Sequence, residues 1–166
     1  MKKNILLIIL ISIGTVIIAQ GPIDKGESQI NFGLGLSTYG LPVYAGFDVG
    51  VHEDVTVGGE VSYRSYHNSY YYIKYTHTII GISGNANYHF NNILEIPSNF
   101  DAYAGLNVGF YIWSSSDDYI GDGASGLGIG AQIGGRYYFT DRLSVNLEFG
   151  GGSYVSSGKL GLTFRL

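Results

Sequence analysis

His67, Asn68 and Ser69 are the residues whose types and spacing come closest to hydrolytic chemistry. A His-x-Ser pair supplies a hydroxyl nucleophile and a base, but the base also needs a carboxylate to orient it. No carboxylate stands at a matching downstream strand position. We therefore interpret this histidine and this serine as hydrophilic loop residues and predict no catalytic residue.

A second set of residues could form an acid-base or metal site. Asp117, Asp118 and Asp122 could join His67 or His77 at the rim of the molecule. Their spacing matches no known set of metal ligands, so a solvated acidic loop is the better interpretation. The sequence predicts no metal and no cofactor.

Tyrosine is concentrated in one short segment, which is the strongest candidate for binding. Tyrosine with serine and asparagine supplies large contact area and adaptable hydrogen bonds, as in antibody paratopes. The alternative is that these tyrosines extend the neighbouring strands and stiffen them. The candidate binding residues are Tyr66, His67, Tyr70, Tyr71, Tyr72 and Tyr75, with Asp117, Asp118 and Tyr119 from a second loop.

The elements that must position these residues are strands. Between Asp101 and Trp113 every second residue is apolar, and the residues between are small, polar or tyrosine. Side chains alternate between the two faces of a strand, so such a segment has one apolar face and one polar face. The same pattern predicts strands over residues 29–38, 43–51, 55–65, 76–90, 101–113, 125–139, 143–155 and 159–166.

The N-terminus has the layout of a secretory signal peptide. Lys2 and Lys3 precede an apolar run that ends at Ala19, too short for a membrane helix. We expect residues 1–19 to be removed, which leaves residues 20–166 as one domain. Loss of two lysines leaves seven basic residues against 13 acidic ones, a formal charge of −6 in place of −4. Nucleic acid is therefore excluded as a partner, and the absence of cysteine excludes disulfides and thiolate metal sites.

Two features indicate that the apolar face meets lipid. The polar face is rich in glycine, as expected where side chains must fit inside a narrow barrel. Aromatic residues gather near strand ends, where interfacial girdles lie. We predict an all-β, eight-stranded antiparallel up-and-down transmembrane β-barrel in the outer membrane, with both termini periplasmic. The alternative is a soluble secreted lipocalin-like barrel with an apolar interior that binds a ligand.

An inward polar face places charged residues inside the barrel. Unpaired charges there are costly, so we expect a network of salt bridges and hydrogen bonds. Eight strands leave an interior just wide enough for side chains, so the lumen should be filled. The predicted network consists of Asp48, Glu60, Arg64, Arg136, Glu148, Lys159 and Arg165.

Three segments carry a family resemblance: the turn at 137–145, the strand at 103–109 and the final strand at 160–166. With the signal peptide and the eight strands, they resemble the OmpX/OmpA-type outer-membrane barrel superfamily, especially small barrel proteins of Bacteroidetes. The resemblance implies a monomer in outer-membrane lipid and recognition of the last strand by the barrel-insertion machinery. That strand usually ends in an aromatic residue, whereas Leu166 is last here.

The function expected from this resemblance is non-enzymatic: a structural role, or contact with an extracellular ligand or surface partner through the outer loops. The alternative is an outer-membrane enzyme at the loop rim, similar to a lipid A deacylase or an outer-membrane protease. Of these two, the deacylase has the His-x-Ser spacing of His67 and Ser69.

Overall fold

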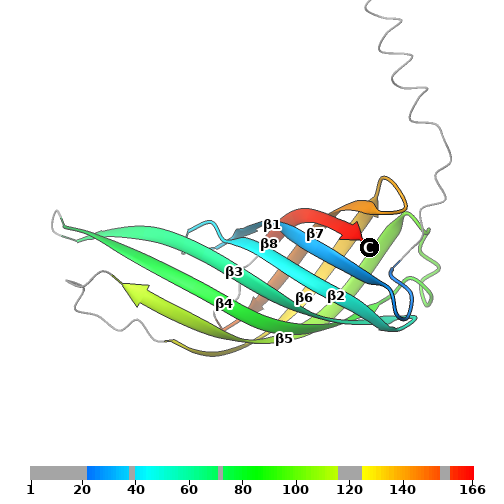
Figure 1. Cartoon of the computed structure of the whole chain (residues 1–166), viewed down its shortest axis with the longest axis horizontal. Helices are drawn as coiled ribbons and strands as arrows, with labels where there is room; N and C mark the ends of the chain where they lie inside the picture. Colours follow the sequence, from blue (N-terminus) through cyan, green and yellow to red (C-terminus); the bar gives the residue numbers. More distant parts are fainter. Residues whose placement is uncertain (1–21, 38–39, 71–72, 116–124, 154–157) are drawn as a thin grey trace, which may run out of the picture.

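A computed structural model of the chain describes residues 22–37, 40–70, 73–115, 125–153 and 158–166. They form a closed antiparallel barrel in which each strand pairs with the next and the last pairs with the first (Figure 1). No helix among these residues is long and apolar enough to cross a membrane. The strands are β1 (Ser28–Leu36), β2 (Val43–His52), β3 (Val55–Tyr70), β4 (Ile73–His89), β5 (Phe100–Ser115), β6 (Gly126–Tyr138), β7 (Leu143–Gly152) and β8 (Gly158–Arg165). The predicted eight-stranded fold is confirmed, while the predicted signal peptide lies outside the described residues.

The pairing register fixes the stagger of the barrel. A walk from partner to partner around the wall starts at Ala102 on β5 and returns to β5 at Ile112, ten residues further along. For eight strands this stagger corresponds to a strand tilt of about 40°. The walk passes through Ala102, Gly135, Leu147, Leu160, Leu34, Val43, Tyr63, Ile80 and Ile112.

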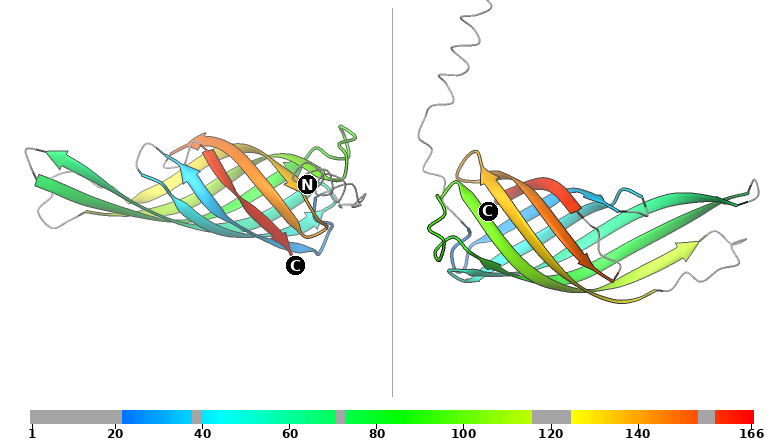
Figure 2. Two further views of the ribbon diagram at one scale, coloured as in Figure 1. Left: turned by 90° about the horizontal axis from the view of Figure 1, so that it is seen from above. Right: turned by 180° about the vertical axis from the view of Figure 1, so that it is seen from behind.

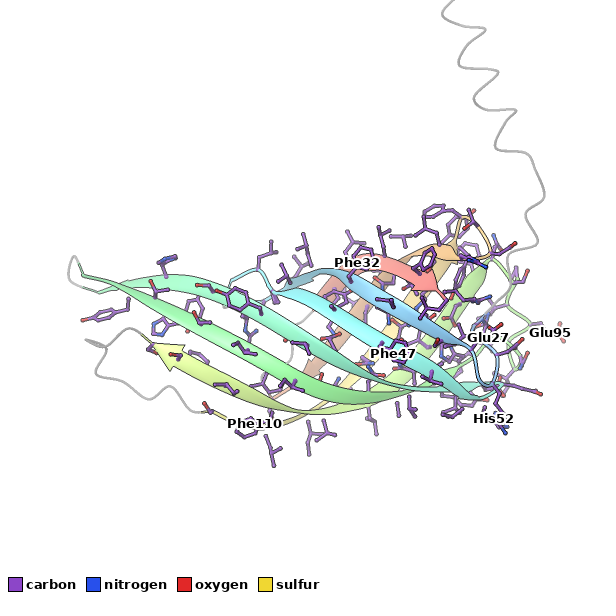
Figure 3. All side chains as sticks on the ribbon, viewed as in Figure 1. Glu27, Phe32, Phe47, His52, Glu95 and Phe110 are labelled. Atoms are coloured by element: carbon purple, nitrogen blue, oxygen red, sulfur yellow. The ribbon has the colours of Figure 1, made fainter. Side chains whose placement is uncertain are left out.

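The apolar face of every strand points outward. Leu106 and Leu127 are 66% and 74% exposed, and Figure 3 shows Phe110 pointing away from the barrel. The inward positions carry polar side chains such as Asn107 and Gln132, which are buried. A lipocalin needs the opposite arrangement, so the soluble alternative is wrong.

The outward apolar residues form a belt of bilayer height. On β5 the belt runs from Phe100 to Ile112, a height of about 30 Å at this tilt. At the edge of the belt nearest the C-terminus, aromatic rings contact one another in pairs, as in an interfacial girdle. We call these rings the terminal girdle, because the C-terminus lies at the same end: Tyr88 with Phe90, Phe100 with Tyr137, and Tyr137 with Phe139.

At the opposite end, which we call the loop end, β3, β4 and β5 continue past the belt. Tyr63, Ile80 and Ile112 are the last outward apolar residues in their strands, and the next outward row is Ser65, Thr78 and Ser114. Beyond that row β3 and β4 form a hairpin that projects well past the rest of the barrel, and β5 flanks it as far as Ser115 (Figure 2). We call these ends of the three strands the projecting wall. The predicted strand bounds at residues 65 and 76 are therefore wrong: β3 reaches Tyr70 and β4 begins at Ile73, which agrees with the alternative that the tyrosines extend the neighbouring strands.

Residues 22–27 fold into the mouth at the terminal end. Gly50 lies on the inward face of β2, where a Cβ atom would lie 2.2 Å from the carbonyl oxygen of Asp24. Backbone hydrogen bonds join Gly50 to Gly26 and to Glu27. Ile23 is 1% exposed, so this segment closes the mouth of the barrel at the terminal end.

Candidate functional site

The lumen holds equal numbers of opposite charges. Among the described inward side chains, four are acidic and four are basic, with histidine counted as neutral. An interior with no net charge avoids the cost of an uncompensated buried ion. The acidic residues are Asp48, Glu60, Asp101 and Glu148, and the basic residues are Arg64, Arg136, Lys159 and Arg165.

Arg136 joins two acids near the terminal end. Its Nη1 donates to Asp101 Oδ2 at 2.7 Å, and its Nη2 lies 3.4 Å from Asp48 Oδ2. Its guanidinium also lies 4.4 Å from the centre of the Tyr103 ring. Arg136 and Asp101 are 4% and 2% exposed, so both charges depend on each other rather than on water.

The hydrogen bonds around Arg136 continue from strand to strand across the lumen. Asp101 bonds to His89 and His89 to Thr56, while Asp48 accepts from Asn31. From Asn31 the chain of bonds continues through Thr163 and Asn146 to the Tyr44 hydroxyl. One connected network thus includes residues from all eight strands: Thr56, His89, Asp101, Arg136, Asp48, Asn31, Thr163, Asn146 and Tyr44.

A second layer of charged side chains lies nearer the loop end of the lumen and is centred on Lys159. Its Nζ donates to Glu60 Oε2 at 2.7 Å and to Glu148 Oε1 at 3.2 Å. The Tyr103 hydroxyl donates to the other oxygen of Glu148 at 3.1 Å. We call Glu60, Glu148 and Lys159 the lysine layer.

The other two predicted lumen charges also point inward. Arg64 donates from Nη1 to Ser37 Oγ at 2.9 Å, and the Arg165 guanidinium lies 5.2 Å from the centre of the Tyr138 ring. The structure therefore brings Asp48 together with Arg136, and Glu60 together with Lys159 and Glu148. Arg64 contacts Ser37, and Arg165 lies against the Tyr138 ring.

The lysine layer separates two small cavities. One lies toward the loop end and is lined by Arg64, Ser62 and Tyr111, while the other is lined by Asp48, Arg136 and Tyr103. Each has a volume of about 30 Å³, enough for one or two water molecules. The lumen is filled, in agreement with the expected diameter of an eight-stranded barrel.

Thr56, His89 and Asp101 have the order of a nucleophile, a base and an orienting acid. Thr56 Oγ1 lies 3.0 Å from His89 Nε2, and His89 Nδ1 lies 2.7 Å from Asp101 Oδ1. A carboxylate only accepts, so Nδ1 carries a proton, and in the neutral imidazole Nε2 then accepts from the threonine hydroxyl. Thr56 is fully buried and His89 is 1% exposed, so no substrate reaches this group. Its role is to satisfy buried polar atoms.

The inner face of the projecting wall carries an aromatic cluster of Tyr66, His77 and Trp113. The His77 ring stacks on Tyr66 at 4.8 Å between ring centres, and Trp113 meets both rings edge-on at about 6 Å. His77 Nδ1 lies 2.8 Å from Ser115 Oγ. The cluster packs three neighbouring strands together where the barrel no longer encloses them.

The other predicted binding residues are described only in part. His67 lies on β3 and is exposed, and Tyr75 lies on β4 and is half-buried. The backbone of Tyr70 pairs with Ile73 at the tip of the wall. Tyr71, Tyr72, Asp117, Asp118, Asp122 and Tyr119 lie outside the described residues. The described residues contain no group of three or more His, Asp or Glu side chains that could hold a metal ion.

Comparisons with known proteins match the fold and not the sequence. No family model matches the chain, and no curated protein matches its sequence. The solved structure of OprG from Pseudomonas aeruginosa superposes with a TM-score of 0.66 at 10% identity, over 89% of this chain and 99% of OprG. Ail, the attachment invasion locus protein of Yersinia pestis, solved with the heparin analogue sucrose octasulfate, gives 0.55 at 14% identity, over 86% and 99%. This chain has the fold of the small outer-membrane barrels.

A third match shows how little this outer-membrane barrel fold says about function. A de novo designed transmembrane β-barrel superposes with a TM-score of 0.52 at 14% identity, over 87% of this chain and 98% of the design. Since natural and designed proteins share the architecture, any specific role must lie in residues added to it. In this chain the projecting wall is the part of the barrel that extends furthest from the C-terminal end (Figure 2).

Sequence reasoning missed His89 and Asp101 as members of the lumen network. Asp101 begins the alternating segment and has the same parity as Tyr103, which is inward. His89 has the same parity as Asn87. The alternation places both residues on the polar face, but the predicted network included neither.

Proposed function

We propose that this protein is a non-enzymatic outer-membrane barrel with a closed lumen, which acts through contacts made by its projecting wall. The support for membrane insertion is the outward apolar belt, whose height of about 30 Å matches the hydrocarbon core of a bilayer. Ion pairs and hydrogen bonds fill the interior, so passage of solutes is not its activity.

The proposed orientation puts both termini in the periplasm. Outer-membrane barrels have short periplasmic turns and longer extracellular segments. The terminal end carries a two-residue turn at Glu53–Asp54 and a short turn at 139–142, whereas the wall projects from the other end. The predicted signal peptide at 1–19 agrees with this orientation.

One observation favours a surface-contact role above the others: the belt ends at Tyr63, Ile80 and Ile112, and three strands continue beyond it. A barrel that served only as a membrane plug needs no wall above the lipid. β2 pairs with β3 only as far as Tyr63, and β6 pairs with β5 only as far as Tyr111. Beyond Tyr63 no described strand pairs with β3 on its β2 side, which gives the wall an edge that can pair with an added strand. On β5 the Trp113 amide already donates to Ser125 Oγ at 3.0 Å.

The partner class that fits such a wall is an extended polypeptide. Backbone pairing at a strand edge supplies affinity, and neighbouring side chains supply specificity. Ail was solved with a heparin analogue, but a polyanion suits this chain poorly because its formal net charge is −4.

Orientation can be tested with single cysteines, because the native chain has none. We expect Thr76→Cys, on the wall, to react with a membrane-impermeant maleimide on intact cells. Glu53→Cys and Asp141→Cys, at the terminal end, should react only after the outer membrane is permeabilised. Labelling of the Glu53 variant on intact cells would mean that the barrel is inverted.

Binding can be tested by removing the wall and keeping the barrel. Ser65 pairs with Thr78, so an Asn-Gly turn replacing residues 66–77 closes a hairpin just above the belt. We expect a phage library of extended peptides to yield binders of the native protein in nanodiscs that do not bind the shortened form. Thr76→Ala is the matched control and should keep the binders. Peptides that bind both forms equally, or binding of immobilised heparin, would overturn the proposal.

A further inference from the structure

The connection between β4 and β5 differs from the other turns at the terminal end. The turn after β2 contains Glu53 and Asp54, and the turn after β6 contains Asp141 and Arg142. The β4–β5 connection is longer and holds three aliphatic residues with a single charge, Glu95. Two of them, Ile93 and Leu94, are 69% and 64% exposed.

Hydrogen bonds hold this connection in one shape. The Asn91 side chain donates to the carbonyl of Phe100 at 2.6 Å and accepts from the Ala102 amide at 3.3 Å. The Asn92 side chain donates to Asp54 at 2.8 Å, which ties the connection to the neighbouring turn. Within it, the Leu94 amide bonds to the carbonyl of Phe90 at 2.9 Å. The aliphatic side chains are therefore displayed on an ordered turn.

Glu95 marks the tip of this turn. Its φ of 50° is uncommon for a residue other than glycine, and Figure 3 shows it at the terminal extreme of the molecule. This backbone conformation turns the chain sharply between Leu94 and Ile96. The charged side chain of Glu95 can thus stay in water while the aliphatic side chains on either side of it leave the water.

The third aliphatic residue shows which way the turn faces. Ile96 lines a groove of about 620 Å³ on the outer wall, together with Phe100, Tyr137, Ala102 and Gly135. Phe100 and Tyr137 belong to the terminal girdle, with ring centres 4.8 Å apart. At Ile96 the apolar surface of the turn is therefore continuous with the belt.

We propose that Ile93, Leu94 and Ile96 form a membrane foot: an apolar turn that inserts into the leaflet beside the terminal girdle. This inference rests on the proposed membrane location, but it does not depend on which way the barrel faces. Burial in the bilayer removes the exposed aliphatic surface from water. A lipid surface fits better than a protein partner because the foot continues the belt that already meets lipid.

Tryptophan reporters test this directly, because the chain has one tryptophan. In a Trp113→Phe background we would place a single tryptophan at Leu94, at Glu53 or at Val108. Glu53 is the water control in a polar turn, and Val108, which is 54% exposed on the outer wall, is the lipid control. Each protein is reconstituted into phosphatidylcholine vesicles with brominated acyl chains and titrated with iodide.

We expect the Leu94→Trp reporter to be quenched by bromolipid, as the Val108→Trp reporter is, and protected from iodide. The Glu53→Trp reporter should show the opposite response. A Leu94→Trp reporter quenched by iodide alone would overturn the foot and leave an apolar tip available to a periplasmic protein. Absence of bromolipid quenching at Val108 as well would instead overturn the membrane location.

Folding is checked for each variant by the gel-mobility shift on boiling, and Ile93→Trp replaces Leu94→Trp if the latter does not fold. A second measurement uses Ile93→Ser with Leu94→Ser. This pair should lower the urea midpoint in vesicles, whereas Glu53→Ser should not. An unchanged midpoint in the double variant contradicts insertion.

Discussion

At the scale of residues, a few basic side chains stabilise the lumen because each of them pairs with more than one carboxylate. Arg136 serves two carboxylates, and Lys159 serves two more. The sequence predicted that charged residues on the polar face would form a network, because strand parity places them inside. Which acid meets which base depends on the stagger between strands, and the stagger cannot be read from one strand at a time. For this reason the pairing of Arg136 with Asp48 was not predicted, and Asp101 was not among the predicted network residues.

Replacing Arg136 should destabilise the barrel strongly. Arg136→Met leaves Asp101 and Asp48 buried without their shared cation, which costs about 3–5 kcal/mol. Arg142→Met, in an exposed turn, is the matched control and should change the free energy of unfolding by less than about 0.5 kcal/mol. Urea unfolding in micelles measures both. Equal stability of the two variants would show that the ion pairs contribute nothing net.

Glycine makes room for the lumen tyrosines, and this can also be tested. A Cβ atom on Gly134 would lie 2.4 Å from the Tyr103 ring, which Arg136 and Glu148 hold in place. Gly134→Ala should therefore cost about 1–3 kcal/mol. Gly151→Ala, where a Cβ atom meets nothing within 4 Å, should be neutral or slightly stabilising. Thermal unfolding of the two alanine variants separates close packing from a general effect of glycine loss.

At the scale of elements, the alternating pattern predicts a strand only where its two faces differ. Inside the bilayer one face meets lipid and the other meets the lumen, so apolar and polar residues alternate. Beyond Tyr63 and Ile80 the outward face meets water, the contrast disappears, and residues 66–75 resemble a loop although the strands continue. Tyrosine and threonine favour strands, and this was the signal for the alternative that the tyrosines extend the hairpin.

The upper edge of the belt can be located with arginine. Leu106→Arg, in the middle of the belt on β5, should cost about 2–4 kcal/mol in lipid. Ser114→Arg lies on the same strand and the same outward face, past Ile112, and should cost about 0–1 kcal/mol. Folding equilibria in lipid vesicles compare the two variants. A large penalty at Ser114 would place the membrane boundary higher on the wall.

At the scale of the whole molecule, the strand register closes the barrel and the apolar belt covers its outer surface. The protein must therefore be folded in detergent or lipid. The first and last strands pair along eight residues, so the barrel closes only when β8 pairs with β1. Closure leaves the belt region without sheet edges. The fold class was predictable because it follows from parity and strand number, whereas the height of the wall on one side was not.

This closure predicts a cooperative, heat-sensitive particle. Protein folded in detergent should migrate faster on a gel when loaded without boiling, and boiling should abolish the difference. A truncation before Gly158, which removes β8, should migrate identically with and without boiling because the ring cannot close. A truncated chain that retained the mobility shift would show that pairing of β1 with β8 is dispensable.

The ten-residue stagger has a consequence for how the length of this chain can change. A circuit of the wall returns to the same face of β5 because ten is an even number. Deleting one residue inside a strand exchanges the faces of everything on one side of the deletion, so that a leucine in the belt would enter the lumen and an asparagine would meet lipid. Insertions and deletions within the belt are therefore tolerated in pairs. At the loop end, past the cluster of Tyr66, His77 and Trp113, neither face meets lipid, so a single gained or lost residue moves no side chain between lipid and lumen, and new contacts can arise there without disturbing the barrel.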